Sequence, residues 1–174
     1  MAFITSGSTV ISFAEYEDVL AIDQRLFEAN EFGSTVDVIV EDALIKATGR
    51  ILNKIRASDW WKNYYISRTT DLTSIAARTG YSLPMPVGAK ILTRKDEFQD
   101  MCVYFTLAEY LYPKVADFGN TDSAERQKIG FYDEKFRAMF TDLLNAGDWY
   151  DFSGDNTIDI TEKAPSRQNL VRVR

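Results

Sequence analysis

Six oxygen-bearing side chains near the C-terminus are spaced as in a calcium-binding loop. They occupy positions 1, 3, 5, 7, 9 and 12 of such a loop: Asp151, Ser153, Asp155, Thr157, Asp159 and Glu162. Oxygen ligands at this spacing are what calcium requires, and Ile158 supplies the apolar residue at position 8. Position 6, where these loops use glycine for a sharp turn, is Asn156, while Gly147 and Pro165 oppose the two flanking helices. We therefore expect a β-hairpin over residues 149–162 without a metal, and no cofactor.

The usual catalytic groups are missing from the sequence. The chain has no histidine, the commonest general base and zinc ligand. Its one cysteine, Cys102, lies in the most apolar stretch and is expected to be a buried, inert thiol. The nine glycines form no phosphate-binding loop or nucleophile elbow. Acidic pairs such as Glu41 with Asp42 are typical of solvated helix faces in so acidic a chain. The sequence therefore predicts that the protein is not an enzyme.

Composition indicates a single folded chain with a substantial core. The 174 residues are 45% hydrophobic and 13% aromatic, which suffices for a domain of ordinary size. A formal net charge of -6 argues against general affinity for phosphate backbones. The N-terminal residues 1–12 show no positive region before a long apolar run, so we expect neither a secretory signal nor a membrane anchor, and a cytoplasmic location after synthesis.

The elements that must position any site are predicted to be helices. The stretch Asp96–Tyr112 is apolar on nearly every side from Met101 onward, which places it at the centre of an all-α bundle. Thr93 is expected to cap this helix and Pro113 to end it. Twelve apolar residues interrupted by a glutamate are too few to span a bilayer.

Three further helices are predicted around it. A capping box from Ser12 opens one over Phe13–Ala29, and the cleanest amphipathic pattern covers Thr35–Ala57. Ser123 can cap a last long helix that Gly147 ends. Basic residues at i, i+4 steps on the second of these helices could face a partner or nucleic acid, although a solvated stripe is favoured: Lys46, Arg50 and Lys54.

Two segments allow alternative interpretations. The aromatic run from Trp60 to Tyr65 is typical of a core or a subunit contact, and less so of a base-stacking platform. The stretch Asp71–Ser82 resembles the first helix and turn of a helix-turn-helix, which would make the protein a small DNA-binding regulator. Pro84 and Pro86 follow, however, and disfavour the recognition helix that should come next. The role of the wider stretch Ser67–Lys90 stays open.

The C-terminal residues have no core-forming pattern. After Lys163 the chain ends with alternating apolar and basic side chains preceded by one further arginine: Arg167, Leu170, Val171, Arg172, Val173 and Arg174. Such an arm is suited to adding along another chain's strand or lying in an acidic groove, and a loose terminus is the alternative. The predicted organisation is therefore a helical bundle domain over 1–148, a hairpin over 149–162 and an extended arm over 163–174.

The order of these segments resembles a known family. The capped first helix, EDALIKATGRILNKIRA, ILTRKDEFQDMCVYFTLAEYLY and AERQKIGFYDEKFRAMFTDLL, closed by GDWYDFSGD and an arm, look like the head-to-tail adaptor (connector, or head completion) proteins of tailed bacteriophages. The resemblance implies a mainly α fold with four long helices. It also implies a homo-oligomeric ring of about twelve copies under the portal in the virion neck.

The resemblance further implies what the ring meets. It would extend the DNA channel, letting DNA pass without specific binding, and would receive the tail or a stopper protein. Residues Arg167 to Arg174 would then dock the subunit onto the portal protein, and no membrane is involved.

Overall fold

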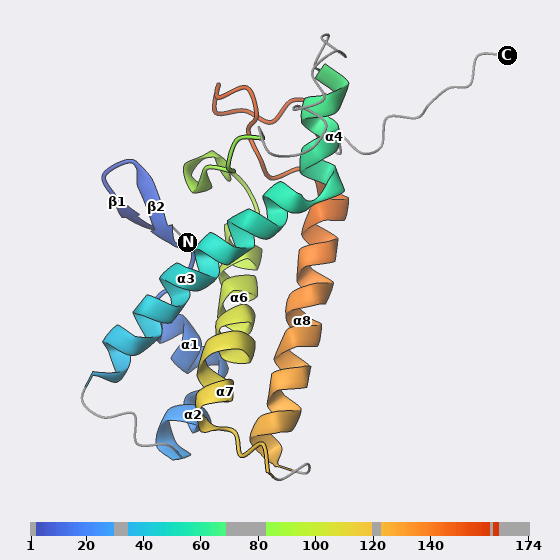
Figure 1. The fold of residues 1–174 in the computed structure, drawn as a ribbon. Helices are drawn as coiled ribbons and strands as arrows, with labels where there is room; N and C mark the ends of the chain where they lie inside the picture. The colour runs from blue at the N-terminus through green and yellow to red at the C-terminus, as the bar shows by residue number, and fades with distance from the viewer. Residues whose placement is uncertain (1–2, 30–34, 69–82, 120–122, 161, 164–174) are drawn as a thin grey trace, which may run out of the picture. The chain divides into compact units, whose positions relative to one another are not determined.

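The computed structural model describes residues 3–29, 35–68, 83–119, 123–160 and 162–163. It is mainly helical, as predicted, with one small antiparallel sheet (Figure 1). The chain divides into two compact units, Met1–Ile51 with Arg94–Thr141 and Leu52–Thr93 with Asp142–Arg174. This division differs from the ranges predicted from the sequence, because two long helices each run through both units.

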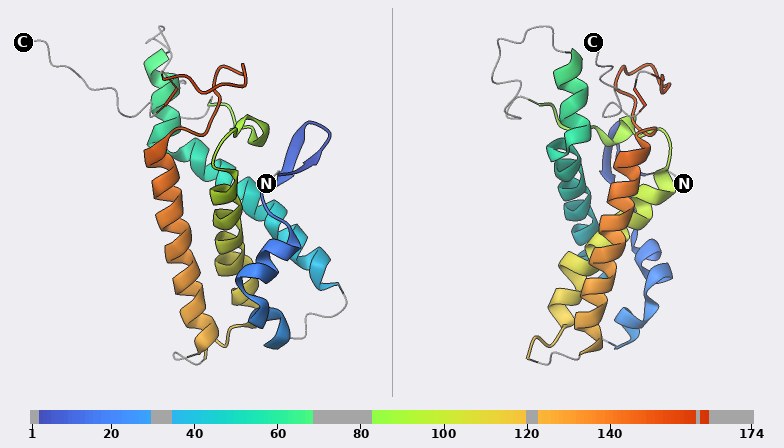
Figure 2. Two further views of the ribbon diagram at one scale, coloured as in Figure 1. Left: turned by 180° about the vertical axis from the view of Figure 1, so that it is seen from behind. Right: turned by 90° about the vertical axis from the view of Figure 1, so that its right-hand side faces the viewer.

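The centre of the first unit is helix α6, Lys95–Thr106. Its buried side chains include Phe98, Met101, Cys102, Val103, Phe105 and Thr106. The Cys102 sulfur lies 3.5 Å from the Thr48 hydroxyl of α3 (Val36–Ala57). The Phe105 ring lies 4.7 Å from that of Phe136 in α8 (Ala124–Ala146). Within this unit α6 therefore packs between α3 and α8, as Figures 1 and 2 show.

Both predicted ends of the central helix are wrong. The Thr93 hydroxyl donates instead to the carbonyl of Asp148 at 2.7 Å, and Arg94 precedes the helix with a φ of 55°. At the other end the chain passes Pro113 through a π-helical segment (Leu107–Leu111) and a short helix, α7 (Tyr112–Val115). Proline cannot donate to a carbonyl in the preceding turn, so a wider turn just before it lets the helix continue.

The first predicted helix is broken in two. Helix α1 spans Tyr16–Ile22 and α2 spans Gln24–Ala29, with Asp23 between them. The cap also differs from the prediction, because the Glu15 N–H donates to the Asp18 carboxylate at 2.8 Å. Ser12 belongs to a strand instead.

The β structure is at the other end of the chain from where it was predicted. Strands β1 (Ile4–Ser6) and β2 (Thr9–Ser12) form an antiparallel hairpin around Gly7, whose φ is 61°. Among the described part of 149–162 the predicted hairpin is absent, and Tyr150 makes only an isolated bridge to Ile91. The physical reason is local, since the loop's own carboxylates bind backbone N–H groups that a partner strand would otherwise need.

The second unit is built on aromatic packing. Ser58 caps α4 (Asp59–Arg68) by accepting the Trp61 N–H at 3.3 Å. Trp60 stacks on Trp149 with ring centroids 4.5 Å apart, and further rings from α4 and residues 149–152 pack around them: Trp61, Tyr64, Tyr65, Tyr150 and Phe152. Trp60, Trp61 and Tyr64 are buried, so the aromatic run forms core.

The remaining bounds in this unit follow local signals. A 3-10 turn, Gly88–Lys90, precedes Ile91. Gly147 ends α8 with a φ of 62° and an N–H that donates to the Leu143 carbonyl at 3.1 Å, as predicted.

Among the described residues, none of the helices combines enough length and apolarity to cross a bilayer.

Capping of α8 gives a stability test. The Ser123 hydroxyl accepts the Arg126 N–H at 3.3 Å, in the position the sequence predicts. We expect Ser123→Ala to lower the free energy of unfolding by about 1 kcal/mol, whereas Ser123→Asp keeps the acceptor and changes it little. Urea denaturation of the two variants and the wild type checks this, and equal losses in both variants would contradict a capping role.

Candidate functional site

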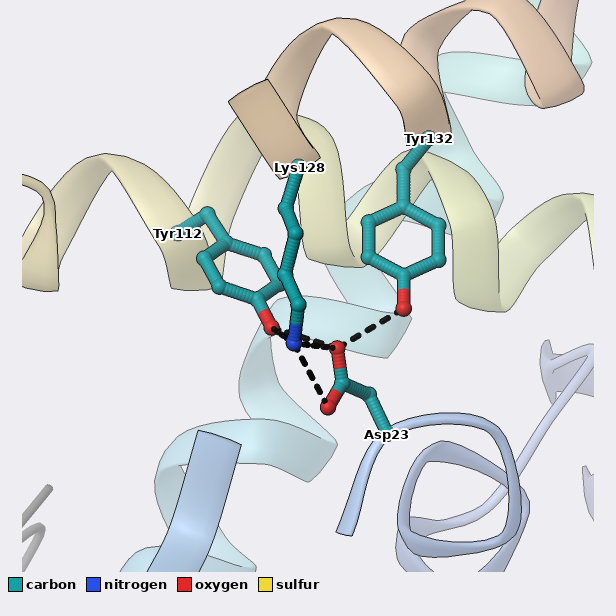
Figure 3. Close-up of polar contacts among 4 residues, drawn as sticks. All are labelled: Asp23, Tyr112, Lys128 and Tyr132. Carbon is teal, nitrogen blue, oxygen red and sulfur yellow. Dashed lines mark hydrogen bonds and ion pairs between the residues drawn. The ribbon is translucent and has the colours of Figure 1, made fainter. Parts of the chain in front are cut away.

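One buried carboxylate gathers three polar side chains in the first unit. Asp23 lies at the break between α1 and α2, and its carboxylate accepts hydrogen bonds from Tyr112, Tyr132 and the Lys128 ammonium (Figure 3). The Tyr132 bond is 2.7 Å and the Lys128 contacts are 2.8 and 3.1 Å. Lys128 also donates to the Tyr112 oxygen at 2.7 Å. The cluster joins α7 and α8 to a point between 89 and 109 residues earlier in the chain.

The surroundings keep this carboxylate ionised. Burial of Asp23 would raise its pKa, but the hydrogen bonds from Lys128, Tyr112 and Tyr132 outweigh burial and hold the pKa below its ordinary value. Burial together with the bond to Asp23 raises the pKa of both tyrosines, so their hydroxyls stay protonated and act as donors. The result is a charged acceptor surrounded by fixed donors.

This arrangement acts as a structural clamp. Three of the four contacts converge on the Oδ2 atom of Asp23, from Tyr112, Tyr132 and Lys128, and Lys128 also reaches Oδ1. Because these donors come from α7 and α8, the Asp23 cluster ties both helices to the break between α1 and α2.

Sequence reasoning did not single out Asp23. Its signal was weak but present, because a charged residue interrupts the apolar pattern of the predicted helix Phe13–Ala29. Tyr132 lies on the inner face of the last helix, 6% exposed.

The six predicted calcium ligands form an ordered loop in the second unit. Asp151 and Glu162 are each 2% exposed. The Asp151 carboxylate accepts the N–H groups of Gly154 at 2.5 Å and Asn156 at 2.9 Å. Glu162 accepts those of Ser153 at 2.7 Å and Asp159 at 3.1 Å. The buried carboxylates therefore bind the loop's own backbone.

Backbone conformation and charge agree with this description. Asn156 adopts the left-handed conformation, with a φ of 63°, at the position where glycine was expected. Burial would raise the pKa of Asp151, yet the N–H donors of Gly154 and Asn156 hold it below its ordinary value. Within the described residues, no three acidic or cysteine side chains are grouped so that they could hold a metal ion.

The other predicted positions are buried, exposed or outside the described residues. Cys102 is buried, and burial raises the pKa of its thiol to about 12. Lys46, Arg50 and Lys54 are exposed on α3. The helix-turn-helix segment Asp71–Ser82 and the arm residues Arg167 to Arg174 lie outside the described residues.

Comparisons with protein-family models, with curated proteins and with solved structures find no match to this chain. Inferences about its role therefore rest on its own residues.

The Asp23 cluster predicts a pH dependence of stability. Because the folded pKa of Asp23 lies below its ordinary value of about 3.9, the cluster's stabilisation is present above that pH and is lost as pH falls through the folded pKa. We expect Asp23→Ala to lower the free energy of unfolding by about 3 kcal/mol near neutral pH, the low end for buried pairs because Lys128 is partly exposed.

Urea denaturation at a series of pH values checks both points. Asp133→Asn is the matched control, since it removes only a surface ion pair with Arg137 and should cost well under about 1 kcal/mol. An Asp23→Ala variant as stable as this control would show that the cluster does not stabilise the fold.

The acidic loop predicts a weak response to calcium. Calcium would have to displace backbone donors from Asp151 and Glu162 before it could bind, so we expect millimolar calcium to leave the thermal midpoint unchanged. Isothermal titration calorimetry provides the direct measurement. Micromolar binding that disappears in Glu162→Gln would contradict the prediction.

Proposed function

We propose that this protein is a structural subunit of the virion neck of a tailed bacteriophage. In this proposal it is a head-to-tail adaptor that forms a ring of about twelve copies under the portal. The ring extends the DNA channel toward the tail and meets the tail or a stopper protein on its far side. The subunit is made in the host cytoplasm and then becomes part of the virion.

The observation that carries the proposal is the order of the long helices. Helices α3, α6 and α8 cover the segments on which the resemblance to head-to-tail adaptors rests. The broken pair α1 and α2 stands where the fourth helix of the bundle is expected. A bundle of four long helices, with the first divided at Asp23, is the architecture we propose for the subunit.

The polar residues of the described chain support a structural role. The Asp23 carboxylate is held by three partners, and the carboxylates of Asp151 and Glu162 bind their own loop. The net charge of -6 suits a channel protein that must let DNA slide past without holding it. The alternative, a small DNA-binding regulator, depends on residues 71–82, which lie outside the described residues.

The portal is the proposed partner of the C-terminal arm. Arg167, Arg172 and Arg174 give the arm its positive charge, and Leu170, Val171 and Val173 alternate with it. An acidic groove would attract the arginines, while pockets or a strand edge would receive the apolar side chains. This docking role for the arm supplies a direct test of the proposed function.

We expect deletion of residues 166–174 to abolish co-purification with the portal protein of the same phage. The thermal midpoint should stay nearly unchanged, because a segment without core-forming residues contributes little to folding. Replacing Arg167, Arg172 and Arg174 with glutamate should weaken docking more than alanine does, since repulsion adds to the lost attraction.

A matched control reverses charge elsewhere. Lys114→Glu alters an exposed residue of α7 and should leave docking intact. If the truncated protein assembles normally onto portal-bearing heads at equal folded concentration, the arm is not the docking element.

A further inference from the structure

The outward side of α3 in the first unit carries exposed apolar side chains. Val38 and Ile45 are 54% and 43% exposed. At about 100° per residue, the buried residues Val40, Leu44 and Ala47 lie on the opposite side of the helix. In Figures 1 and 2 helix α6 lies on one side of this part of α3 within the first unit. The core is therefore on one side of α3, and Val38 and Ile45 are left on the other.

A glycine continues this apolar stripe. At about 100° per residue, Val38, Ile45 and Gly49 fall within about 40° of one another around the helix. A Cβ added at Gly49 would meet nothing within 4 Å. Glycine weakens a helix relative to alanine, and packing within the described chain does not require it at this position. A close approach by a helix of another chain would make use of it.

Two opposite charges border the stripe on the same side. Asp42 and Lys46 are exposed and lie one turn apart, with the acidic residue nearer the N-terminus of the helix. Among the described residues, neither forms an ion pair with the other or with a third side chain. The surface made by these residues and the stripe is called the α3 face: Val38, Asp42, Ile45, Lys46 and Gly49.

The order of the two charges makes the α3 face complementary to itself when it is reversed. A second copy running parallel would place Asp42 against Asp42 and Lys46 against Lys46, which repel. A second copy running antiparallel about a two-fold axis keeps both charged borders on the same side and places unlike charges together. With Val38 opposite Gly49 of the second copy, Asp42 and Lys46 of the two copies lie within one residue, about 1.5 Å, of the same level.

We propose that the free protein forms a two-fold symmetric dimer in which the α3 faces of two copies pack antiparallel. Val38 packs onto the backbone at Gly49 of the second copy, and the two Ile45 side chains meet near the axis. Asp42 of each copy pairs with Lys46 of the other. Such a contact closes with two copies, so it concerns the chain before any larger assembly and does not rest on the proposed ring.

The remaining acidic residue of this surface is compatible with the dimer. Glu41 is exposed and borders the stripe on the side away from Asp42 and Lys46. In the antiparallel register the two Glu41 residues lie five residues apart along the axis, about 7.5 Å. Both carboxylates therefore stay at the solvated rim, where like charges at this separation cost little.

Charge exchange in the full-length chain tests the contact by sedimentation equilibrium. Asp42→Lys places two lysines opposite each other, and Lys46→Glu places two carboxylates opposite each other, so each variant should dimerise at least tenfold more weakly than the wild type. An equimolar mixture of the two should form heterodimers, because every pair is again of unlike charge. The double variant Asp42→Lys with Lys46→Asp should dimerise with itself for the same reason.

Control variants separate position from net charge. Glu134→Lys and Lys135→Glu make the same changes in net charge at exposed residues of α8, and both should dimerise like the wild type. Gly49→Ala should raise the thermal midpoint of the fold and yet weaken dimerisation at least several-fold, because the methyl group obstructs the approach of Val38 from the second copy.

The outcomes separate this contact from the proposed function. Weak dimers in both single variants, with recovery on mixing and in the double variant, support the antiparallel pair. The pair is overturned by a wild-type chain that stays monomeric at its highest soluble concentration, by single variants that dimerise like the wild type, or by a mixture that does not recover. Each of these results leaves the virion role untouched, and absence of the chain from virions would leave the dimer untouched.

Discussion

From Met101 onward, α6 and the chain that follows it have almost no side that can be left in water, and the first unit depends on covering this stretch. Beyond the buried residues of α6, the following segment buries Leu107, Ala108, Leu111 and Tyr112. A segment that is hydrophobic all round is stable only when other elements surround it. Helix α1 and the parts of α3 and α8 that belong to the first unit meet this requirement.

The packing of other helices against α6 brings together the residues of the Asp23 cluster. The end of α1 and the start of α8 both approach the residues that follow α6, and Asp23, Lys128 and Tyr112 meet there. A buried carboxylate is costly unless several donors satisfy it, so removing one partner affects the others. The same arrangement leaves apolar side chains exposed on the outer sides of α3 and α8, Val38 and Ile45 on the first and Phe131 on the second.

Features set by neighbouring residues could be predicted from the sequence. The stripe of apolar residues on α3 gave its bounds almost to the residue, and the serine caps at Ser58 and Ser123 depend only on the next turn. Features set by distant residues could not be predicted. The break at Asp23 depends on Lys128 and Tyr132, more than a hundred residues away.

Two predictions, the helix end at Pro113 and the hairpin over residues 149–162, were wrong because another local interaction prevails. Pro113 was expected to stop a helix, but a π turn placed just before it removes the conflict. The alternation in residues 149–162 suggested a hairpin, whereas Asp151 and Glu162 bind the backbone groups that pairing would use. The hairpin at residues 4–12 is uncharged and carries Gly7 at its turn, a pattern that could have indicated it.

The proposed function joins these parts into one account: a clamped helical unit, and a C-terminal arm proposed to dock onto the portal. Its central claim is that the protein is a component of the virion. Quantitative mass spectrometry of purified tailed particles of the phage that encodes it measures this most directly. The account predicts this chain in those particles, in a copy number comparable to that of the portal protein. Its absence from purified particles, with abundant protein left in the lysate, would contradict the account.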